Sequence, residues 1–211
     1  MNILVIGASQ GTGALAVRAA LEKGHRVTAF ARRPNKLTLD DPRLRKVTGD
    51  FHQAASVEAA VPGHDAVIVT VSATTLRGFK ANPRYFSQGT GYVIAGMKKA
   101  EVKRLVVLSA LGVGESRRLL NPLLRALMVD FLLKGPFEDH ERQESLVQAS
   151  GLDWVVARPS RLTNGPARRR YAKKTLVESV PSSISRADVA DFLVEACEVD
   201  AWVGHAVQLG G

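Results

Sequence analysis

The sequence predicts an α/β fold in which helices cover both faces of a doubly wound parallel sheet. Two observations lead to this prediction. The strand-like segments are apolar along their whole length, as strands buried on both faces are. Between them lie segments in which apolar residues recur at helical spacing, so strands and helices alternate along the chain.

Four strands and three helices are predicted in the first half of the chain. Short apolar runs such as NILVI predict strands at residues 2–6, 25–31, a few residues ending at 47, and 65–71. Helical spacing of apolar residues predicts helices at residues 13–23, 51–61 and 89–100. Gly24 follows the first helix, where glycine commonly ends helices.

The second half continues the alternation. Strands are predicted at residues 104–109, 153–157 and 205–209, and helices at 137–150 and 185–199. Ser185 is the predicted N-cap of the last helix. Residues 112–135 and 163–183 are less regular and follow the carboxyl ends of strands, where open sheets bind ligands. We therefore expect small substrate-side elaborations there, within a single domain of residues 1–211.

Residues 119–133 (LLNPLLRALMVDFLL) are strongly apolar, with Pro122 suited to the first turn of a helix. A core or lid helix is the simplest interpretation. A dimer face or a surface that touches a membrane are the alternatives.

The composition excludes several classes of protein. Apolar residues make up 45% and charged residues 23%, which is typical of a globular chain and not of a disordered one. One cysteine, Cys197, excludes a disulfide framework, and five scattered histidines predict no metal site. No signal peptide or membrane-spanning run is recognised, so a cytoplasmic protein is expected.

The formal net charge of +9 favours an anionic partner. A phosphate-rich cofactor, an acidic small-molecule substrate and nucleic acid all satisfy that condition. Nucleic acid is not predicted, because no recognition motif is present and aromatic residues are sparse near the basic clusters. The oligomeric state is left open.

The most specific motif is the glycine-rich turn GASQGTG at residues 7–13. It follows the first predicted strand and opens the first helix, so Gly7, Gly11 and Gly13 let the backbone approach a diphosphate. The helix N-terminus supplies N–H groups, and Thr12 can add a hydroxyl donor. An ordinary strand–helix turn is the alternative.

The end of the second strand bears on which dinucleotide is bound. NAD-selective sites carry a carboxylate there, whereas an arginine suits a 2′-phosphate. This strand ends in Ala31-Arg32-Arg33-Pro34, so Arg32 and Arg33 favour NADP(H) over NAD(H). A solvated basic loop is the alternative.

Asp50 follows the third predicted strand in the sequence GDF. Its carboxylate can accept a hydrogen bond from an adenine amino group, or it can cap the next helix. The two roles are compatible.

These segments, together with VSA at 71–73, VLSALG at 107–112, SGLDWVVARPS at 150–160 and ISRADVADFLV at 184–194, resemble the atypical short-chain dehydrogenase/reductases. Within that family the sequence is most similar to the NAD(P)H-binding, NmrA-like branch, which includes biliverdin reductase B, also called flavin reductase. The resemblance covers nearly the whole chain and implies a Rossmann-type fold.

The resemblance also implies a set of cofactor-binding residues. Gly7, Ser9, Gln10, Gly11, Thr12 and Gly13 would hold the diphosphate of NADP(H), and Arg32 and Arg33 its 2′-phosphate. Asp50 and Phe51 would flank the adenine, and Val71, Ser72 and Ala73 would line the ribose. Ser109, Pro159 and Ser160 would lie beside the nicotinamide.

The Tyr-x-x-x-Lys acid–base pair of the superfamily is missing, and its positions fall near Pro136 and His140. Ser109 and His140 are therefore the candidate catalytic residues. Ser109 would hydrogen-bond the acceptor or the nicotinamide, and His140 would supply a proton or contact the ribose. A strand-end hydroxyl and a surface histidine are the structural alternatives.

Two residues are candidates for the substrate side. Tyr85 can stack on a ring. Arg161 begins a basic cluster with Arg168, Arg169, Arg170, Lys173 and Lys174, which would attract an anionic flavin or tetrapyrrole unless it is simply a solvated loop.

The resemblance implies an NADPH-dependent oxidoreductase that transfers hydride to a flavin or a similar conjugated acceptor. A non-catalytic NADP(H)-binding redox sensor of the NmrA-like type is the first alternative, because the acid–base pair is missing. A carbonyl or enone reductase with a different proton donor is the second.

Overall fold

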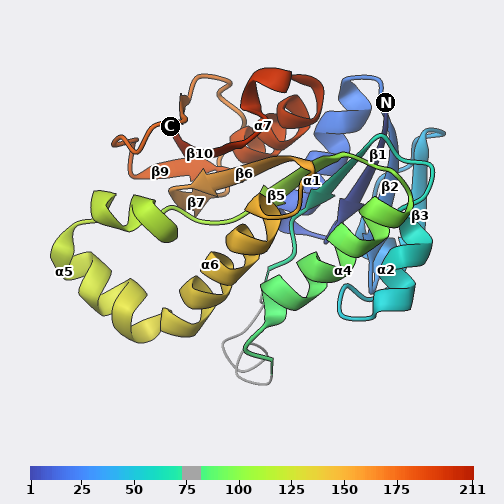
Figure 1. The fold of residues 1–211 in the computed structure, drawn as a ribbon. Coiled ribbons are helices and arrows are strands. Elements are labelled where there is room, and N and C mark those ends of the chain that lie inside the picture. The colour runs from blue at the N-terminus through green and yellow to red at the C-terminus, as the bar shows by residue number, and fades with distance from the viewer. Residues whose placement is uncertain (73–81) are drawn as a thin grey trace.

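The computed structural model describes residues 1–72 and 82–211, and an eight-stranded sheet forms its centre (Figure 1). Across the sheet the order is β3 (Leu44–Thr48), β2 (Arg26–Ala31), β1 (Asn2–Ile6), β4 (Ala66–Val69), β5 (Arg104–Leu108), β6 (Asp153–Pro159), β10 (His205–Gly210) and β8 (Ala172–Lys174). Neighbours from β3 to β10 pair in parallel, whereas β8 pairs antiparallel with β10. The chain reverses its direction of travel across the sheet between β1 and β4, which is where ligands bind in such sheets.

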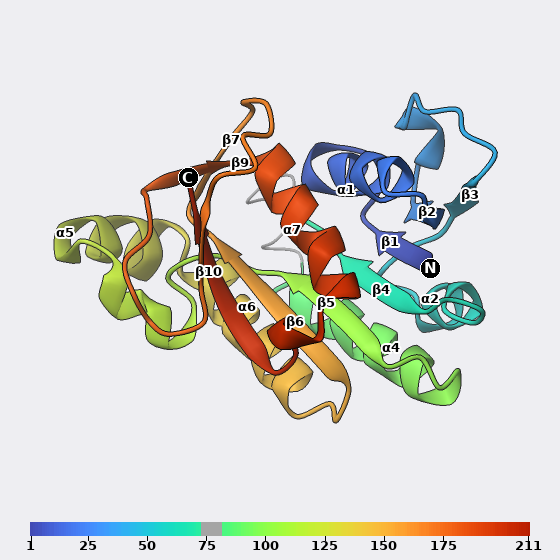
Figure 2. The same ribbon diagram turned by 90° about the horizontal axis from the view of Figure 1, so that it is seen from above.

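Helices cover both faces of the sheet, which confirms the predicted α/β fold (Figures 1 and 2). One face carries α1 (Gly11–Glu22) and α7 (Arg186–Glu198), which pack side by side. The other face carries α2 (Ala54–Ala60), α4 (Tyr85–Lys99) and α6 (Lys134–Gln148).

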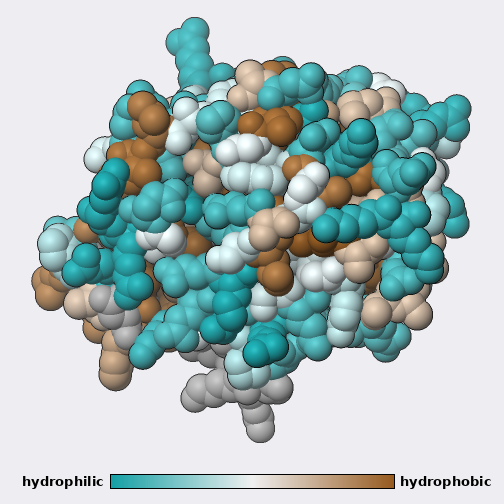
Figure 3. All heavy atoms as spheres, viewed as in Figure 1, coloured by the Kyte–Doolittle hydropathy of each residue, from teal (hydrophilic) through white to brown (hydrophobic). Residues whose placement is uncertain are grey.

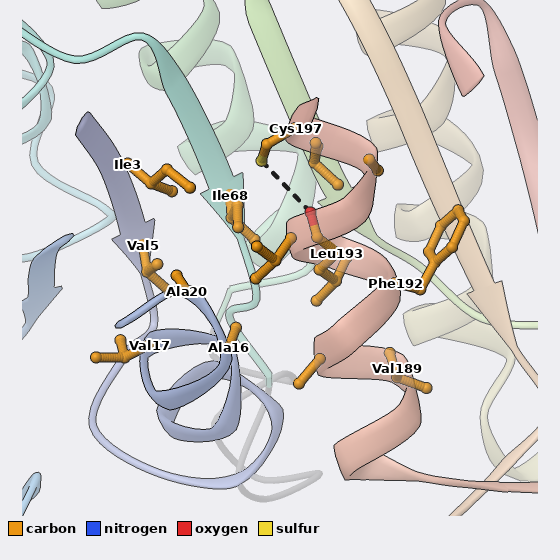
Figure 4. Packing of buried hydrophobic residues seen from close by; sticks show 14 of the residues in the cluster. Ile3, Val5, Ala16, Val17, Ala20, Ile68, Val189, Phe192, Leu193 and Cys197 are labelled. Atoms are coloured by element: carbon orange, nitrogen blue, oxygen red, sulfur yellow. Dashed lines mark hydrogen bonds between the residues drawn. The ribbon is translucent and has the colours of Figure 1, made fainter. Parts of the chain in front are cut away.

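Each face of the sheet has its own hydrophobic core. Along β1, Ile3 and Val5 point toward α1 and α7, whereas Leu4 and Ile6 join the opposite core. Figure 4 shows the first core, where the β1 side chains meet the small and branched residues of the two helices. Cys197 lies in this core, and burial raises the pKa of its thiol to about 12, so it packs as an apolar side chain.

The ends of several helices differ from the predicted ones. Helix α1 begins at Gly11, two residues early, and α4 begins at Tyr85 rather than at 89. The early start of α4 has a cause outside the helix, because Asp139 of α6 accepts a hydrogen bond of 2.6 Å from the Phe86 backbone N–H. Ser185 caps α7 as predicted, by accepting from the Asp188 N–H.

Residues 114–132 form an arm that extends away from the sheet (Figure 1). It consists of a 3₁₀ turn (Gly114–Leu119), α5 (Pro122–Leu124) and a π-helical stretch (Arg125–Leu132). Leu123 is 80% exposed and Phe131 77%, so the interpretation of residues 119–133 as a core helix is wrong. Apolar residues reach the surface at the edge where the arm lies (Figure 3).

The irregular region after β6 contains short strands that the sequence did not predict. β7 (Arg161–Thr163) pairs in parallel with β9 (Ser183–Ser185), and β8 adds the last strand of the main sheet. Each has three residues and is largely polar, so no apolar run marks it.

Over the described ranges, the helices are too short or too polar to cross a lipid bilayer.

Candidate functional site

A cleft of about 540 Å³ opens at the carboxyl ends of the central strands. The ends of β1, β2, β3 and β4 line it, together with residues of β7 and the start of α7. This is the position at which open α/β sheets bind ligands.

The glycine-rich turn forms one wall, and its glycines have different roles. A Cβ on Gly13 would lie 2.3 Å from the Gly7 carbonyl oxygen, and one on Gly7 would lie 2.9 Å from the Val71 nitrogen. These two glycines therefore let β1, β4 and α1 approach each other. Gly11 has φ of +56°, and no atom lies within 4 Å of where its Cβ would be, so its backbone faces open space. Gly11 is the glycine that leaves room for a ligand.

Helix α1 presents its N-terminus to the cleft. Gln10 is the N-cap but makes no side-chain capping bond, and the first turn carries no acidic residue. The free N–H groups and the positive end of the helix dipole therefore favour an anion. Ser9, Gln10 and Thr12 all line the cleft, as predicted from the sequence.

Three cations line the cleft after β2. Arg32 and Arg33 lie where they were predicted, and Lys36 joins them from a 3₁₀ turn that begins at Pro34. In the described ranges, none of the three has a carboxylate within 4.0 Å, unlike Arg43, which pairs with Asp41. Their charge is therefore available to a ligand. Sequence reasoning missed Lys36, for which the Pro-Asn-Lys turn was the only signal.

Asp50 follows β3 by two residues and lines the cleft. Its Oδ1 accepts a 2.9 Å hydrogen bond from the His52 N–H, and the N-cap of α2 is Gln53. The interpretation of Asp50 as a helix cap is therefore wrong, because three residues of turn separate it from α2. Its role at the adenine stays a prediction.

Phe51 lines the cleft and also packs into the core, where it fills the space that Gly89 leaves open. His52 and Tyr85 meet beside it, with ring centroids 4.4 Å apart. Neither ring nitrogen of His52 has a hydrogen-bond partner within the described part of the chain, and burial lowers the pKa of this histidine. Burial raises the pKa of Tyr85, which keeps its hydroxyl protonated at neutral pH. Sequence reasoning missed His52.

The end of β4 contributes Thr70, Val71 and Ser72 to the cleft. The Thr70 hydroxyl donates to the Ile6 carbonyl at 3.0 Å and so ties β4 to β1. Ala73 lies outside the described residues.

Ser109 follows β5 but is not among the residues that line the cleft. Its hydroxyl lies 2.5 Å from Glu144 Oε1 on α6. Arg158 holds Glu144 through bonds from both Nε and Nη2, and its Nη1 donates to Glu115 at 2.6 Å. Both Glu144 oxygens accept hydrogen bonds from Arg158, so the Ser109 hydroxyl donates its hydrogen to Glu144 Oε1.

Arg158 and the two glutamates that surround it stabilise each other's charged forms. Burial by itself lowers the pKa of Arg158, but the hydrogen bonds to Glu144 and Glu115 outweigh it and raise that pKa above its ordinary value. The hydrogen bond from Arg158 lowers the pKa of Glu115. The Arg158 side chain is 1% exposed, and sequence reasoning did not identify it or Glu144.

His140 stacks on Phe86 at a centroid distance of 3.9 Å and lies outside the cleft lining. Gln143 donates to Thr90, which leaves its Oε1 to accept from His140 Nδ1 at 2.8 Å. Burial lowers the pKa of His140. The imidazole is therefore neutral at physiological pH, with its hydrogen on Nδ1.

The residues predicted after β6 do not line the cleft either. The Ser160 N–H donates to the Leu209 carbonyl, and its buried hydroxyl has no partner in the described residues. Arg161 is exposed on β7, next to Pro159 and Ser160.

The expected basic rim is divided. Lys173 pairs with Glu195 on α7, Lys174 pairs with Glu178, and Arg169 lines a separate groove beside α1. Lys173 and Lys174 therefore pair with carboxylates and do not line the cleft, so the expectation of a basic rim that attracts a substrate fails for these two lysines.

Leu162, Asn164 and Arg186 line the cleft from β7 and the start of α7. Sequence reasoning missed all three. The described residues hold no group of histidine, cysteine and acidic side chains that would bind a metal ion.

The model of a family described as NAD(P)H-binding matches residues 7–200. An uncharacterised chloroplast protein of Arabidopsis thaliana is 28% identical over 207 residues, which cover 92% of this chain and 71% of that protein. The structure of an anaerobillin reductase from Escherichia coli O157:H7 is 25% identical, with a TM-score of 0.82 over 100% of this chain and 97% of that one. A short-chain dehydrogenase/reductase from Veillonella parvula, solved in complex with NADP, is 14% identical, with a TM-score of 0.83 over 100% and 94% of the two chains.

Proposed function

The chain belongs to the NAD(P)H-binding family, and from that premise we propose that it is an NADPH-dependent oxidoreductase that reduces a flavin or a similar conjugated acceptor. The observation that carries the cofactor assignment is the cleft, where Gly11 opens beside the N-terminus of α1 and three cations have no carboxylate within 4.0 Å among the described residues. A dinucleotide matches both features, with its diphosphate at the turn and its adenosine toward β2 and β3.

The choice of NADP(H) over NAD(H) rests on Arg32, Arg33 and Lys36. A ribose 2′-hydroxyl needs an acceptor at the end of β2, whereas a 2′-phosphate needs cations there. These three side chains offer charge, and no carboxylate in the described part of the chain pairs with them, so they favour the phosphorylated dinucleotide. Asp50, Phe51 and Tyr85 would enclose the adenine, and Val71 and Ser72 the ribose.

When bound, NADPH supplies a hydride, and the protein supplies orientation. Carbonyl reduction also needs a hydrogen-bond donor at the substrate oxygen. The Ser109 hydrogen is held by Glu144 and the neutral His140 carries its hydrogen toward Gln143, so neither side chain offers that donor. This arrangement favours a conjugated ring acceptor, whose proton comes from water, over a carbonyl or enone.

The substrate-side roles follow from the same chemistry. Ser109 offers lone pairs, which would accept from an N–H of the carboxamide or of the acceptor, with Pro159 and Ser160 beside it. His140 packs the middle of α6 against Phe86 of α4, and its Nε2 is the unprotonated ring nitrogen. The net charge of +9 and the exposed Arg161 favour an anionic acceptor, such as a flavin phosphate or a pigment that carries propionates. The anaerobillin reductase among the similar structures supports a tetrapyrrole as the second acceptor to try.

Absorbance at the nicotinamide band tests the proposal when purified protein is mixed with NADPH and FMN, FAD or biliverdin. Sustained turnover over many equivalents supports the reductase. A non-catalytic NADP(H) sensor is the second candidate, and the missing Tyr-x-x-x-Lys pair favours it. Tight binding of NADP(H) without turnover of any acceptor would establish the sensor and contradict the reductase.

A further inference from the structure

Asn164 and Arg186 lie next to each other at the cleft although 22 residues separate them. The pairing of β7 with β9 explains this, because its register places Thr163 opposite Ser185. Asn164 follows Thr163 and Arg186 follows Ser185, so the two residues lie side by side where the strand pair ends. Both line the cleft together with Gly11 and Thr12.

Arg186 is held in position but keeps most of its hydrogen-bonding capacity. Its Nη1 donates to Asn164 Oδ1 at 2.6 Å, which uses one of five N–H donors. In the described ranges, no carboxylate lies within 4.0 Å of this guanidinium, whereas Arg158, at the end of β6, is enclosed by two. Arg186 is also partly buried, so its charge is less screened than that of a fully exposed arginine.

We propose that Arg186, oriented by Asn164, binds the diphosphate of the dinucleotide from the β7–β9 side of the cleft. This inference rests on the proposed function. Gly11 and the N-terminus of α1 provide uncharged N–H donors to the diphosphate, and Arg186 adds the positive charge that they lack. The cations after β2 belong to another strand end and serve the 2′-phosphate.

Loss of Arg186 and loss of the cations after β2 should therefore change the affinities for NAD⁺ and NADP⁺ in different ways. A residue that binds the diphosphate contributes equally to NAD⁺ and NADP⁺, because both carry that group. Arg186→Ala should weaken both by a common factor of about tenfold to a hundredfold, as for the loss of a charge-assisted hydrogen bond. A residue that binds the 2′-phosphate affects NADP⁺ far more than NAD⁺.

Isothermal titration with NADP⁺, NAD⁺, ADP-ribose and 2′-AMP tests the assignment. Arg186→Ala should weaken the first three ligands and leave 2′-AMP, which has no diphosphate, within about twofold. Asn164→Asp should weaken the same three, because the new carboxylate pairs with Arg186 and competes with the ligand. Arg186→Lys should lie between wild type and Arg186→Ala, since it keeps the charge but loses the fork.

Arg26→Ala is the matched control, because Arg26 is exposed at the opposite end of β2. Unchanged NADP⁺ affinity in Arg186→Ala would overturn the inference. A loss of affinity that is confined to NADP⁺ and spares NAD⁺ would overturn it as well. If Arg186→Ala does not fold, Asn164→Asp and Arg186→Lys decide in the same way. Failure of the wild type to bind any dinucleotide would instead refute the proposed function.

Discussion

Arg158 shows how a single side chain can fix the chemistry of a neighbour. It is buried at the end of β6 and donates hydrogen bonds to Glu144, and Glu144 in turn accepts the hydrogen of Ser109. The Ser109 hydroxyl therefore acts as an acceptor toward anything bound beside it. Because Ser109 has no hydrogen to donate to a carbonyl oxygen, we propose reduction of a conjugated ring and not of a carbonyl.

Replacing Arg158 by methionine should strongly destabilise the protein. Glu144 would stay buried without its partner, and breaking a buried ion pair in this way costs about 3–5 kcal/mol of unfolding free energy. Urea titration followed by circular dichroism measures the change. Arg26→Met, at an exposed position, should change it by no more than about 0.5 kcal/mol. Equal stability of Arg158→Met and wild type would show that the network carries little energy.

The cations after β2 make a prediction about coenzyme choice. The double variant Arg32→Ala/Arg33→Ala should lose about tenfold to a thousandfold in affinity for NADPH while NADH changes only slightly, because only NADPH carries the 2′-phosphate. Fluorescence titration with both coenzymes measures the two affinities. An equal loss for NADH and NADPH would refute the 2′-phosphate assignment.

At the level of elements, the β1–α1 turn combines two kinds of glycine. Gly13 keeps the turn compact, and Gly11 leaves open space in front of the helix. The turn therefore packs closely against β1 at Gly13 and leaves space for a ligand at Gly11.

The variants Gly11→Ala and Gly13→Ala should separate these two roles. Gly13→Ala places a methyl group 2.3 Å from the Gly7 carbonyl oxygen. The backbone must shift to relieve this contact, and the unfolding free energy should fall by about 1–3 kcal/mol or more. Gly11→Ala meets no atom and should lose only about 1 kcal/mol, from its positive φ, but it should weaken NADP⁺ binding. Thermal unfolding and isothermal titration read the two effects. Unchanged NADP⁺ affinity in folded Gly11→Ala would contradict the assignment of the turn.

The elements that the sequence predicts correctly are those with a recognisable pattern of residues within the element itself. The apolar runs of β1, β2, β4 and β5 and the glycine turn are such patterns, and the structure contains them where expected. The three-residue strands β7, β8 and β9 have polar sequences and form only because a neighbouring strand is present.

The same distinction applies to the site. Arg32 and Gly11 follow strands directly and can be recognised from their place in the chain. Arg186 and Glu144 gain their roles from partners that tertiary packing brings to them, from 22 and 14 residues away. No spacing in the sequence marks such pairs.

At the scale of the whole molecule, the net charge of +9 acts together with the local cations of the cleft. Many of the other cations are paired, for example Lys23 with Glu198 and Arg104 with Asp200. The cations of the cleft, which have no carboxylate partner among the described residues, therefore concentrate positive potential where an anionic coenzyme would enter.

Binding of NADP⁺ should consequently weaken as salt rises. Raising ionic strength from about 0.05 M to about 0.5 M shortens the screening length severalfold, so the affinity should fall, and more for NADP⁺ than for NAD⁺. Titrations at a series of potassium chloride concentrations give the two slopes. Affinity for NADP⁺ that does not change with salt would show that charge contributes little to binding.

Every role proposed above depends on the binding of NADP(H) in the cleft at the carboxyl ends of β1 to β4. Calorimetric titration of the folded wild-type protein with NADP⁺ and NAD⁺ tests it most directly. We expect one NADP⁺ bound per chain, with higher affinity than NAD⁺. Absence of heat from either dinucleotide, with protein that unfolds cooperatively and is therefore folded, would contradict it.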